Sequence, residues 1–431
     1  MSDKWINVAV VGTGKIYNDA HRDAYINKYS KNIALIGLCD RFKDLAKEQF
    51  KWMKKRYQRL LKRAKKKENT DDIERIKFAL DHLKVWKEYS RMLDDLEGVL
   101  DLVDNCTHGA GHIPLSVEAM EHGYHAMSEK PPGLNWWDVK RAVEAEEKTG
   151  KYFQLNENVC YERPTQRCRE VIMGGKIGKV GELTVAFGHG GPYIPYTIGE
   201  TGLPHFIDPV LSGGGCLQDL APHGISKAFW PVGPGSRVMS CETTVLERRK
   251  NPRIMSEKPF ESPVDDWAEA ELILHDPRTN SEYTMNVVTS WCGSPSAFPF
   301  GIEGEKGTLS IAQNPDSKKY EPVLYPDDPD EDQVYFEVED DPWEPFRGHI
   351  REIQIFADHI LHDTPSSTPA SYALALQECL SIQYFSKLQG KEVTVEEMDE
   401  WGKEIMDNHD DEQLAIETIS LELVKAVDLK T

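Results

Sequence analysis

The chain has 431 residues, which at about 150 residues per domain predicts two or three domains. A formal net charge of −21 argues against nucleic-acid binding as the main function, and a hydrophobic content of 39% argues against wholesale disorder. No apolar run approaches the ~20 residues that cross a bilayer, no signal-peptide pattern is present, and the eight cysteines include no Cys-x-x-Cys pair. We therefore expect a soluble cytoplasmic protein with reduced thiols.

Residues 1–157 alternate apolar strands with helices. The predicted strands are 8–11, 33–39, 99–105 and the segment before Glu129, and the predicted intervening helices are about 21–29 and 113–122. Continuous apolar strands that alternate with helices indicate a doubly wound parallel sheet. We therefore expect an α/β nucleotide-binding domain here.

A basic segment at about 48–84 interrupts this alternation. Apolar residues such as Trp52, Leu60, Ile73 and Ile76 recur in it at helical intervals, and Asn69-Thr70-Asp71-Asp72 is typical of a turn with a helix cap. The pattern predicts an inserted helical hairpin that packs one face on its own chain or a neighbour. A patch for an anionic ligand is the alternative, which the acidity of the remaining chain disfavours.

After about residue 155 the pattern changes to long, alternating, β-branched segments joined by Gly-, Pro- and Asp-rich connections. We expect strands at 182–187, 238–246, 268–274 and 283–290, an acidic loop at 327–332, and helices at 349–361 and 371–388. These features predict an α+β domain with an open, mostly antiparallel sheet at 158–395. An acidic helical extension follows at 396–431, with Trp401 and Ile416 available for docking.

Gly12-Thr13-Gly14 directly follows a predicted buried strand, which is the position of a dinucleotide-binding turn. The first glycine permits the tight turn, and the second lets the backbone approach a pyrophosphate. Tyr17 replaces the third glycine of the fingerprint, so the motif is incomplete. Asp40 ends the second strand, where a carboxylate binds ribose hydroxyls and repels a 2′-phosphate, which favours NAD over NADP. Arg41 follows and weakens that preference.

The peptide Glu129-Lys130-Pro131 closes this first domain and resembles a motif of the Gfo/Idh/MocA oxidoreductases, which include inositol dehydrogenases and glucose–fructose oxidoreductase. The resemblance implies that Lys130 lies between nicotinamide and substrate and that Pro131 follows a cis peptide bond. A Lys in that position holds the reacting hydroxyl and stabilises its developing negative charge. A surface lysine in a loop is the alternative.

The resemblance extends over nearly the whole chain apart from the basic hairpin and the tail beyond about residue 395. It includes Cys106-Thr107-His108, the crossing segment 156–164, and Gly304-Glu305-Lys306-Gly307. It implies a Rossmann domain and a homodimer or homotetramer formed through the open sheet. The implied cofactor contacts are Gly12, Gly14, Lys15, Ile16, Asp40, Arg41, Thr107, His108, His112, Glu129, Lys130 and Asn158.

A second motif with catalytic residue types is the glycine-rich stretch 213–215 followed by Asp219 and His223. We expect the helix here to begin close to Pro222, because proline is tolerated only in the first turn. Asp219 and His223 are four residues apart and share one helix face. By the resemblance, His223 is the general base and Asp219 orients it or holds a hydroxyl. A capping Asp with a buried His is the alternative, and we expect no metal site.

Substrate contacts are expected from Tyr161, His189 and His205 in addition to Asp219 and His223, although ordinary packing explains each of the first three as readily. Tyr193, Tyr196 and Trp291 are further aromatic candidates. Trp136 and Trp137 are expected in the core or at a contact between subunits. The aromatic loop 190–206 favours a substrate larger than a bare polyol.

The combined motifs predict an NAD-dependent oxidoreductase that transfers a hydride between the nicotinamide and a secondary hydroxyl of a sugar, glycoside or cyclitol. One alternative is an enzyme that retains NAD and recycles it, either to cleave a glycosidic bond or to pass the hydride between sugars. Another is a non-catalytic sensor or scaffold, which the intact Lys130, Asp219 and His223 disfavour.

Overall fold

The computed structural model describes residues 4–26, 30–191, 203–249, 262–293, 300–340 and 348–429. The chain divides into two compact units. The first unit comprises Met1–Glu129, Lys140–Asn156 and His349–Ala370, and the second comprises Lys130–Val139, Glu157–Gly348 and Ser371–Thr431. None of the described helices is long and apolar enough to cross a membrane.

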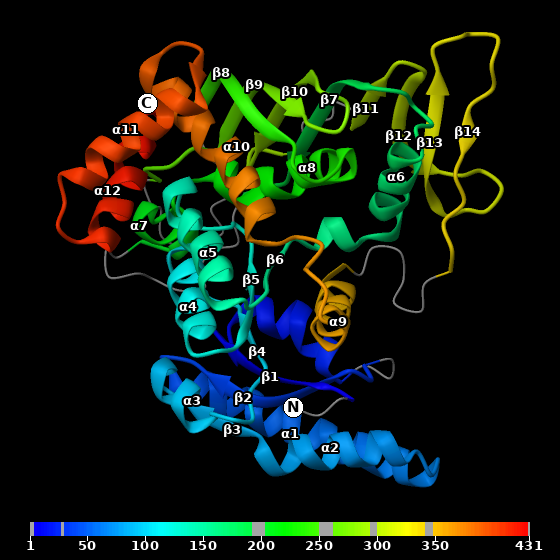
Figure 1. The fold of residues 1–431 in the computed structure, drawn as a ribbon, viewed down its shortest axis with the longest axis vertical. Coiled ribbons are helices and arrows are strands. Elements are labelled where there is room, and N and C mark those ends of the chain that lie inside the picture. The colour runs from blue at the N-terminus through cyan, green and yellow to red at the C-terminus, as the bar shows by residue number, and fades with distance from the viewer. Residues whose placement is uncertain are drawn as a thin grey trace. The chain divides into compact units, whose positions relative to one another are not determined.

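The first unit contains a six-stranded sheet in the order β3-β2-β1-β4-β5-β6, and all five neighbouring pairs are parallel in the described residues (Figure 1). Its strands are β1 (Ile6–Val11), β2 (Ile33–Cys39), β3 (Lys84–Trp86), β4 (Leu102–Asn105), β5 (His125–Glu129) and β6 (Phe153–Asn156). Every residue of β1 and β2 is buried, as expected for central strands covered on both faces. The predicted doubly wound parallel sheet is confirmed.

The first helical segment and the helix predicted at 113–122 begin earlier than expected, the latter at Gly109, and the helix Tyr89–Asp95 was not predicted. The helices of this unit are η1 (Tyr17–His21), η2 (Arg22–Tyr25), α1 (Lys43–Lys66), α2 (Thr70–His82), α3 (Tyr89–Asp95), α4 (Gly109–Glu121), most of α5 (Trp136–Thr149) and most of α9 (Gly348–Leu361). The first helical segment was expected to begin at about His21, but it begins at Tyr17 with a π-helical turn. The amide of Asn18 donates to the carbonyl of Gly14, so the chain winds into a helix directly after the glycine turn. The predicted end at Tyr29 lies outside the described residues.

The basic insertion is the predicted helical hairpin of α1 and α2. Asn69 caps α2 by accepting a hydrogen bond from a backbone amide of its first turn, at 3.1 Å. The hairpin packs on β2, because the buried Tyr57 hydroxyl accepts from the amide of Leu35 at 3.0 Å and Arg75 donates to the carbonyl of Ile33 at 2.8 Å. Most lysines of α1 are exposed on the opposite face.

The second unit contains a ten-stranded mixed sheet in the order β14-β13-β12-β11-β7-β10-β9-β8-β15, with β16 also paired to β8. Its strands are β7 (Val180–Gly188), β8 (Arg237–Arg248), β9 (Trp267–Asp276), β10 (Ser281–Ser290), β11 (Gly301–Gly304), β12 (Gly307–Gln313), β13 (Tyr320–Pro326), β14 (Val334–Tyr335), β15 (Val393–Thr394) and β16 (Asp428–Leu429). The described pairs are antiparallel except β10 with β7 and β16 with β8. The predicted mostly antiparallel sheet is therefore confirmed.

One helix, α8 (Cys216–Val232), packs closely on β7 and β10 of this sheet. A Cβ at Gly224 would lie 2.8 Å from Cγ1 of Val185, so only glycine lets the helix approach the sheet this closely. The other helices of the second unit are η3 (Asn158–Tyr161), α6 (Arg163–Met173), η4 (His205–Ile207), α7 (Pro209–Ser212), α10 (Ala370–Gln389), α11 (Val395–Asp407) and α12 (Glu412–Val424).

The acidic C-terminal segment forms α11 and α12 and docks on residues 135 and 136. Thr394 and Glu397 form a capping box at the start of α11. Trp401 stacks on the fully buried Trp136 with ring centroids 6.3 Å apart, and Asn135 donates to the carbonyl of Ile416 at 2.9 Å. The expected placement of Trp136 in the core is confirmed. These contacts support the segment that directly follows Lys130-Pro131.

Candidate active site

The glycine turn after β1 is crowded on one side and open on the other. Gly12 has a backbone φ of 85°, and a Cβ there would lie 2.6 Å from the carbonyl oxygen of Cys106. A Cβ on Gly14 would meet no described atom within 4 Å. The first position therefore requires glycine, and the second leaves the backbone accessible to a ligand. This arrangement fits the pyrophosphate of a dinucleotide.

Asp40, just after β2, holds the same turn in place. Its Oδ2 accepts hydrogen bonds from the amide and the hydroxyl of Thr13 at 2.8 and 3.0 Å, and its Oδ1 accepts from the amide of Phe42 at 2.8 Å. A carboxylate has about four acceptor positions, so capacity remains for a ribose hydroxyl. Lys15 and Arg41 are exposed, Lys15 in an ion pair with Asp19.

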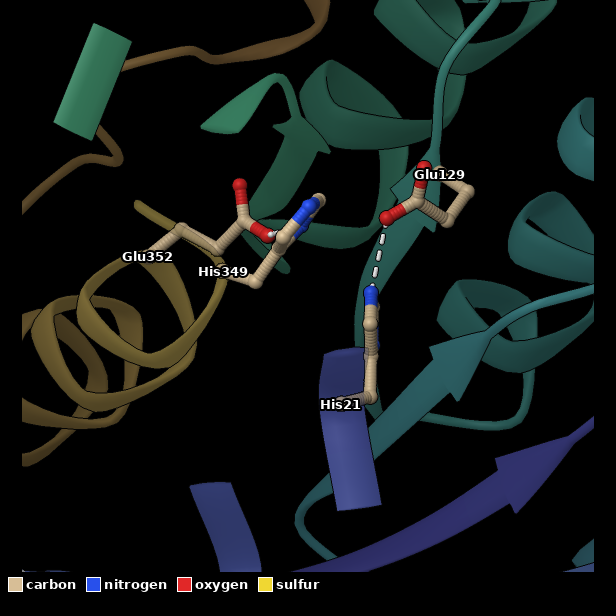
Figure 2. Close-up of side chains that lie close together, drawn as sticks. All are labelled: His21, Glu129, His349 and Glu352. Carbon is tan, nitrogen blue, oxygen red and sulfur yellow. Dashed lines mark hydrogen bonds and ion pairs between the residues drawn. The ribbon is translucent and has the colours of Figure 1, made fainter. Parts of the chain in front are cut away.

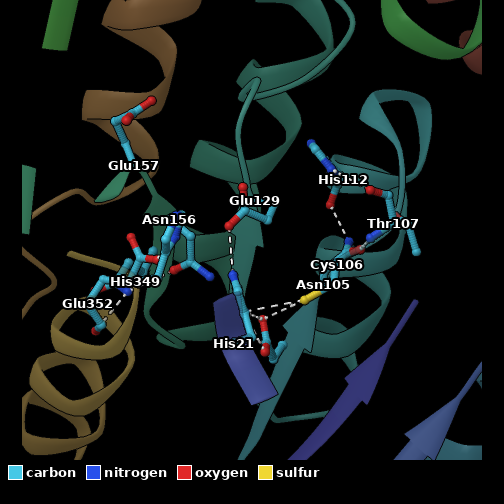
Figure 3. Close-up of polar contacts among 12 residues, drawn as sticks. His21, Asn105, Cys106, Thr107, His112, Glu129, Asn156, Glu157, His349 and Glu352 are labelled. Carbon is cyan, nitrogen blue, oxygen red and sulfur yellow. Dashed lines mark hydrogen bonds and ion pairs between the residues drawn. The ribbon is translucent and has the colours of Figure 1, made fainter. Parts of the chain in front are cut away.

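The loop after β4 is fixed by its own side chains. Oδ1 of Asn105 accepts from the amide and the hydroxyl of Thr107 at 3.2 and 2.6 Å. The amide group of Asn105 donates to the carbonyl of His112 at 3.0 Å, and Nε2 of His112 lies 3.2 Å from the carbonyl of Thr107 (Figure 3). Thr107 and His108 are half-buried and His112 is buried. The loop is thus a rigid edge near the carboxyl end of β4, which is where ligands bind in doubly wound sheets.

In the second unit, Lys130 forms an ion pair with Asp219. Nζ of Lys130 lies 2.7 Å from Oδ1 of Asp219 and 2.9 Å from the Asp219 carbonyl, and the Trp291 indole donates to Oδ2 at 3.1 Å. Burial alone would raise the pKa of Asp219, but Lys130, His223 and Trp291 lower it below its usual value. The Lys130–Pro131 peptide bond is cis, as the resemblance implied. The pair therefore presents a charged ammonium beside a charged carboxylate.

His223 lies on the same helix but takes its carboxylate partner from elsewhere. Its Nδ1 lies 2.6 Å from Oε1 of Glu157, whose side chain is fully buried. The second oxygen of Glu157 has no hydrogen-bond partner in the described part of the chain. Only one nitrogen of His223 is thus engaged by a carboxylate, and Nε2 remains to exchange a proton. The carboxylate hydrogen-bonded to His223 is thus that of Glu157, while Asp219 pairs with Lys130.

The start of α8 also differs from the expectation. The helix begins at Cys216, six residues before Pro222. The Asp265 carboxylate caps it from a distant strand connection by accepting from the amides of Gly215 and Leu217 at 2.9 and 2.8 Å. This long-range cap satisfies the orphan amides, so the helix starts earlier than local signals indicate.

The remaining predicted residues fall into two groups. His189 is half-buried, and burial lowers its pKa while Asp219, Lys130 and His223 act on it electrostatically, so it belongs to the same cluster. Of the other four residues, Tyr161 is buried and Asn158 and Ile16 are half-buried. The ring of His205 lies against that of Phe206, with the ring centroids 4.2 Å apart. Tyr193 and Tyr196 lie outside the described residues. Glu129 is buried in the first unit and pairs with His21 at 2.7 Å.

Sequence reasoning gave no role to Glu157 and Asp265, and it considered Trp291 only as an aromatic platform. Glu157 had a usable signal, because it follows β6 directly and stands between two asparagines in the crossing segment. Asp265 and Trp291 had no such signal in the sequence, because the residues that they contact, Leu217 and Asp219, lie 48 or more residues away.

Comparisons with known proteins agree with these features. Residues 6–157 match the oxidoreductase family with an NAD-binding Rossmann fold, and residues 165–310 match the Gfo/Idh/MocA C-terminal domain. D-glucoside 3-dehydrogenase of Escherichia coli (strain K12) is 23% identical over 236 residues, which are 54% of this chain and 56% of that protein. Glycosyl hydrolase family 109 protein 2 of Bacteroides fragilis (strain YCH46) is 30% identical over 90 residues, 21% of each chain.

Levoglucosan dehydrogenase, solved in complex with NADH and L-sorbose, superposes with a TM-score of 0.66 at 17% identity, covering 91% of this chain and 99% of that chain. The likeness shows a shared fold. The alignments to the curated relatives named above span 56% or less of their length. The two family matches together include the glycine turn, the Lys130 loop and the α8 motif. The chain therefore belongs to the Gfo/Idh/MocA family of oxidoreductases with an NAD-binding Rossmann domain.

Proposed function

We propose that this protein is an NAD-dependent oxidoreductase that transfers a hydride between the nicotinamide and a secondary hydroxyl of a sugar, glycoside or cyclitol. The observation that supports this most is the cluster of the second unit, in which Lys130 pairs with Asp219 and His223 pairs with the buried Glu157. An ammonium beside an imidazole with one available nitrogen is suited to removing a proton from an alcohol. The name of D-glucoside 3-dehydrogenase supports the substrate class.

The residues of the cluster divide the proton chemistry between them. His223 accepts the hydroxyl proton at Nε2, and Glu157 stabilises the imidazolium through Nδ1. Lys130 donates to the reacting oxygen and stabilises its developing negative charge. Asp219 holds Lys130 in position through their ion pair. When bound, NAD supplies the hydride acceptor, so the chain needs only to orient the hydroxyl and remove its proton.

The first unit would hold the cofactor at the positions with the matching geometry. Gly12 and Gly14 leave the turn accessible to the pyrophosphate, and Asp40 would accept from the adenosine ribose. The same carboxylate disfavours a 2′-phosphate, so NAD is the preferred cofactor and NADP the weaker one. Lys15, Ile16, Arg41, Thr107, His108 and His112 are further candidates for cofactor contacts, as are Glu129 and Asn158.

A retained, internally recycled cofactor is the second candidate function, because the Bacteroides fragilis relative is named as a glycosyl hydrolase. Such an enzyme uses transient oxidation to weaken a glycosidic bond and needs no added NAD.

The test mixes the purified chain with a panel of inositols, free sugars and glycosides and follows near-ultraviolet absorbance of reduced nicotinamide, with and without added NAD. A sustained rise that requires added NAD supports the dehydrogenase. Release of free sugar from a glycoside without added NAD favours the recycling enzyme. If every compound gives no change while NAD binds, the proposed activity is wrong.

A further inference from the structure

A second cluster of titratable side chains lies in the first unit, and the proposed proton chemistry does not use it. His21 ends η1, Glu129 ends β5, and His349 and Glu352 lie in the first turns of α9 (Figure 2). Each of these side chains offers one ligand atom, and the four atoms lie within 4.8 Å of one another. Nε2 of His21 is 2.7 Å from Oε1 of Glu129, and Nδ1 of His349 is 3.2 Å from Oε1 of Glu352.

We propose that His21, Glu129, His349 and Glu352 form a binding site for a divalent transition-metal ion, with zinc as the best match. Two imidazoles and two carboxylates are ligands that zinc accepts in four-coordinate sites. The site departs from the sequence-based expectation that the chain holds no metal. It goes beyond the proposed oxidoreductase activity and does not depend on it.

The surroundings of His21 support ligation. Its Nδ1 lies 2.9 Å from Oδ2 of Asp104, and the Tyr25 hydroxyl donates to the same oxygen at 2.5 Å. Histidine ligands of metals usually donate their second ring N–H to a carboxylate, which fixes the tautomer and aims the other nitrogen at the ion. Here that other nitrogen, Nε2, points into the four-residue cluster (Figure 3).

Burial and charge give a second, independent reason. The side chains of Asp104 and Glu352 are fully buried and that of Glu129 is 5% exposed. Oε2 of Glu352 has no hydrogen-bond partner among the residues that the structure describes. A buried carboxylate with an unsatisfied oxygen is costly, and a cation at the cluster removes that cost.

Two of the separations between ligand atoms are already close to those of a tetrahedral site, and the remaining ones lie within 4.8 Å. Ligand atoms about 2.1 Å from a tetrahedral zinc lie about 3.4 Å apart. The His21–Glu129 contact at 2.7 Å would therefore open by roughly 0.7 Å, while the His349–Glu352 contact at 3.2 Å is already close. His349 is 32% exposed and the other three side chains are 5% exposed or less, so an ion reaches the cluster past His349.

Protons compete with the metal for the same lone pairs. Burial disfavours a charged imidazole, yet Asp104 and Cys106 hold the pKa of His21 well above its ordinary value. Metal binding must displace protons from the cluster, so affinity increases with pH.

The experiment uses the full chain, stripped with a chelator and titrated with Zn²⁺ in competition with a chromophoric chelator. We expect one equivalent to bind, with proton release, and we expect H349A and E352Q each to weaken binding by about 10- to 100-fold. H362A is the matched control, because His362 lies just beyond the end of the same helix. Its Nδ1 hydrogen-bonds to the backbone carbonyl of Asp358 rather than to a member of the cluster. It should bind as the wild type does.

Co²⁺ substitution provides a readout that needs no variant. A tetrahedral site with two imidazole ligands gives intense visible absorption bands at one equivalent of Co²⁺. Absence of stoichiometric Zn²⁺ binding by the wild-type chain would overturn the proposal. Equal binding by H349A, E352Q and the wild type would also overturn it, because the ion would then bind elsewhere.

Discussion

The two clusters of titratable side chains use similar residue types in different environments. In the second unit, the side chains of Lys130, Asp219 and His223 are 12–16% exposed. In the first unit, His21 and Glu352 are fully buried. A group that exchanges protons with a substrate must be reachable, whereas a group that is sealed from water holds structure together or binds an ion. Of the four side chains in the first-unit cluster, three are 5% exposed or less and His349 is 32% exposed. The two clusters therefore differ in how many of their side chains a substrate could reach.

The clusters also differ in how charge is balanced. Lys130 supplies a permanent cation to Asp219. Around Asp104, Glu129 and Glu352 the cations among the described contacts are imidazoles, which lose their charge as pH rises. The Lys130–Asp219 pair therefore differs from the His223–Glu157 pair and from the pairs of the first unit, in which the cationic partner is an imidazole.

The largest expected effect is on the proton acceptor. H223A should lower kcat by about 10²- to 10⁴-fold, because it removes the imidazole that accepts the hydroxyl proton. H275A is the control, since His275 lies on β9 and its recorded hydrogen bond is to Asn280. Steady-state rates at saturating NAD measure both. A kcat for H223A close to that of H275A would refute the role.

The next effect concerns Glu157, which we expect to be a positioning residue. E157Q keeps the shape of the side chain but removes the negative charge at 2.6 Å from Nδ1 of His223. We expect kcat to fall about 10- to 100-fold with little change in substrate KM, because the charge stabilises an imidazolium formed only during the reaction. E157D should recover part of the loss. A rise in KM without loss of kcat would assign Glu157 to substrate binding instead.

A smaller effect is expected at the cofactor. D40A removes the carboxylate that holds the glycine turn, and we expect the KM for NAD to rise about tenfold and the preference over NADP to weaken. D44A is the control, since Asp44 is 95% exposed and its recorded partner is Lys47. Initial rates measured with NAD and with NADP give the KM values and the cofactor preference of each variant. An unchanged NAD:NADP ratio in D40A would contradict the assignment.

The smallest effect is on stability in the presence of a chelator. Because the pKa of Glu352 is raised to about 7 in the folded chain, the folded state binds more protons than the unfolded state between about pH 4.5 and 7. Stability should therefore fall as pH rises through that window, by roughly 1 to 3 kcal/mol from this group. E352Q should reduce the decrease in Tm that occurs as pH rises from about 4.5 to 7. Parallel Tm curves for E352Q and the wild type would show that Glu352 does not contribute.

The fold could be read from the sequence because its signals are local. Neighbouring residues alone predict the buried run Val8–Val11, the helix cap at Asn69 and the alternating burial along β9. The start of α8 was misplaced because its cap, Asp265, comes from 48 residues away. A pattern of neighbouring residues cannot predict a cap that comes from so far along the chain.

The candidate site was partly predictable for the same reason. Asp219 and His223 share one helix turn, and Glu129-Lys130-Pro131 is a contiguous motif. The pairing of His223 with Glu157 joins residues 66 apart, and the cluster of His21 and His349 joins residues 328 apart. The packing of α8 against η3 brings His223 to Glu157, and the return of α9 to the first unit brings His349 to His21.

The most direct test follows deuterium from substrate to cofactor. A sugar, glycoside or inositol that turns over, labelled with deuterium at its secondary carbinol carbons, is mixed with NAD and either the wild-type chain or H223A. Mass spectrometry of the recovered cofactor should show one deuterium in the reduced nicotinamide with the wild type and none over the same period with H223A. Unlabelled cofactor from the wild type, or equal labelling with H223A, would contradict the proposed hydride transfer and its proton acceptor.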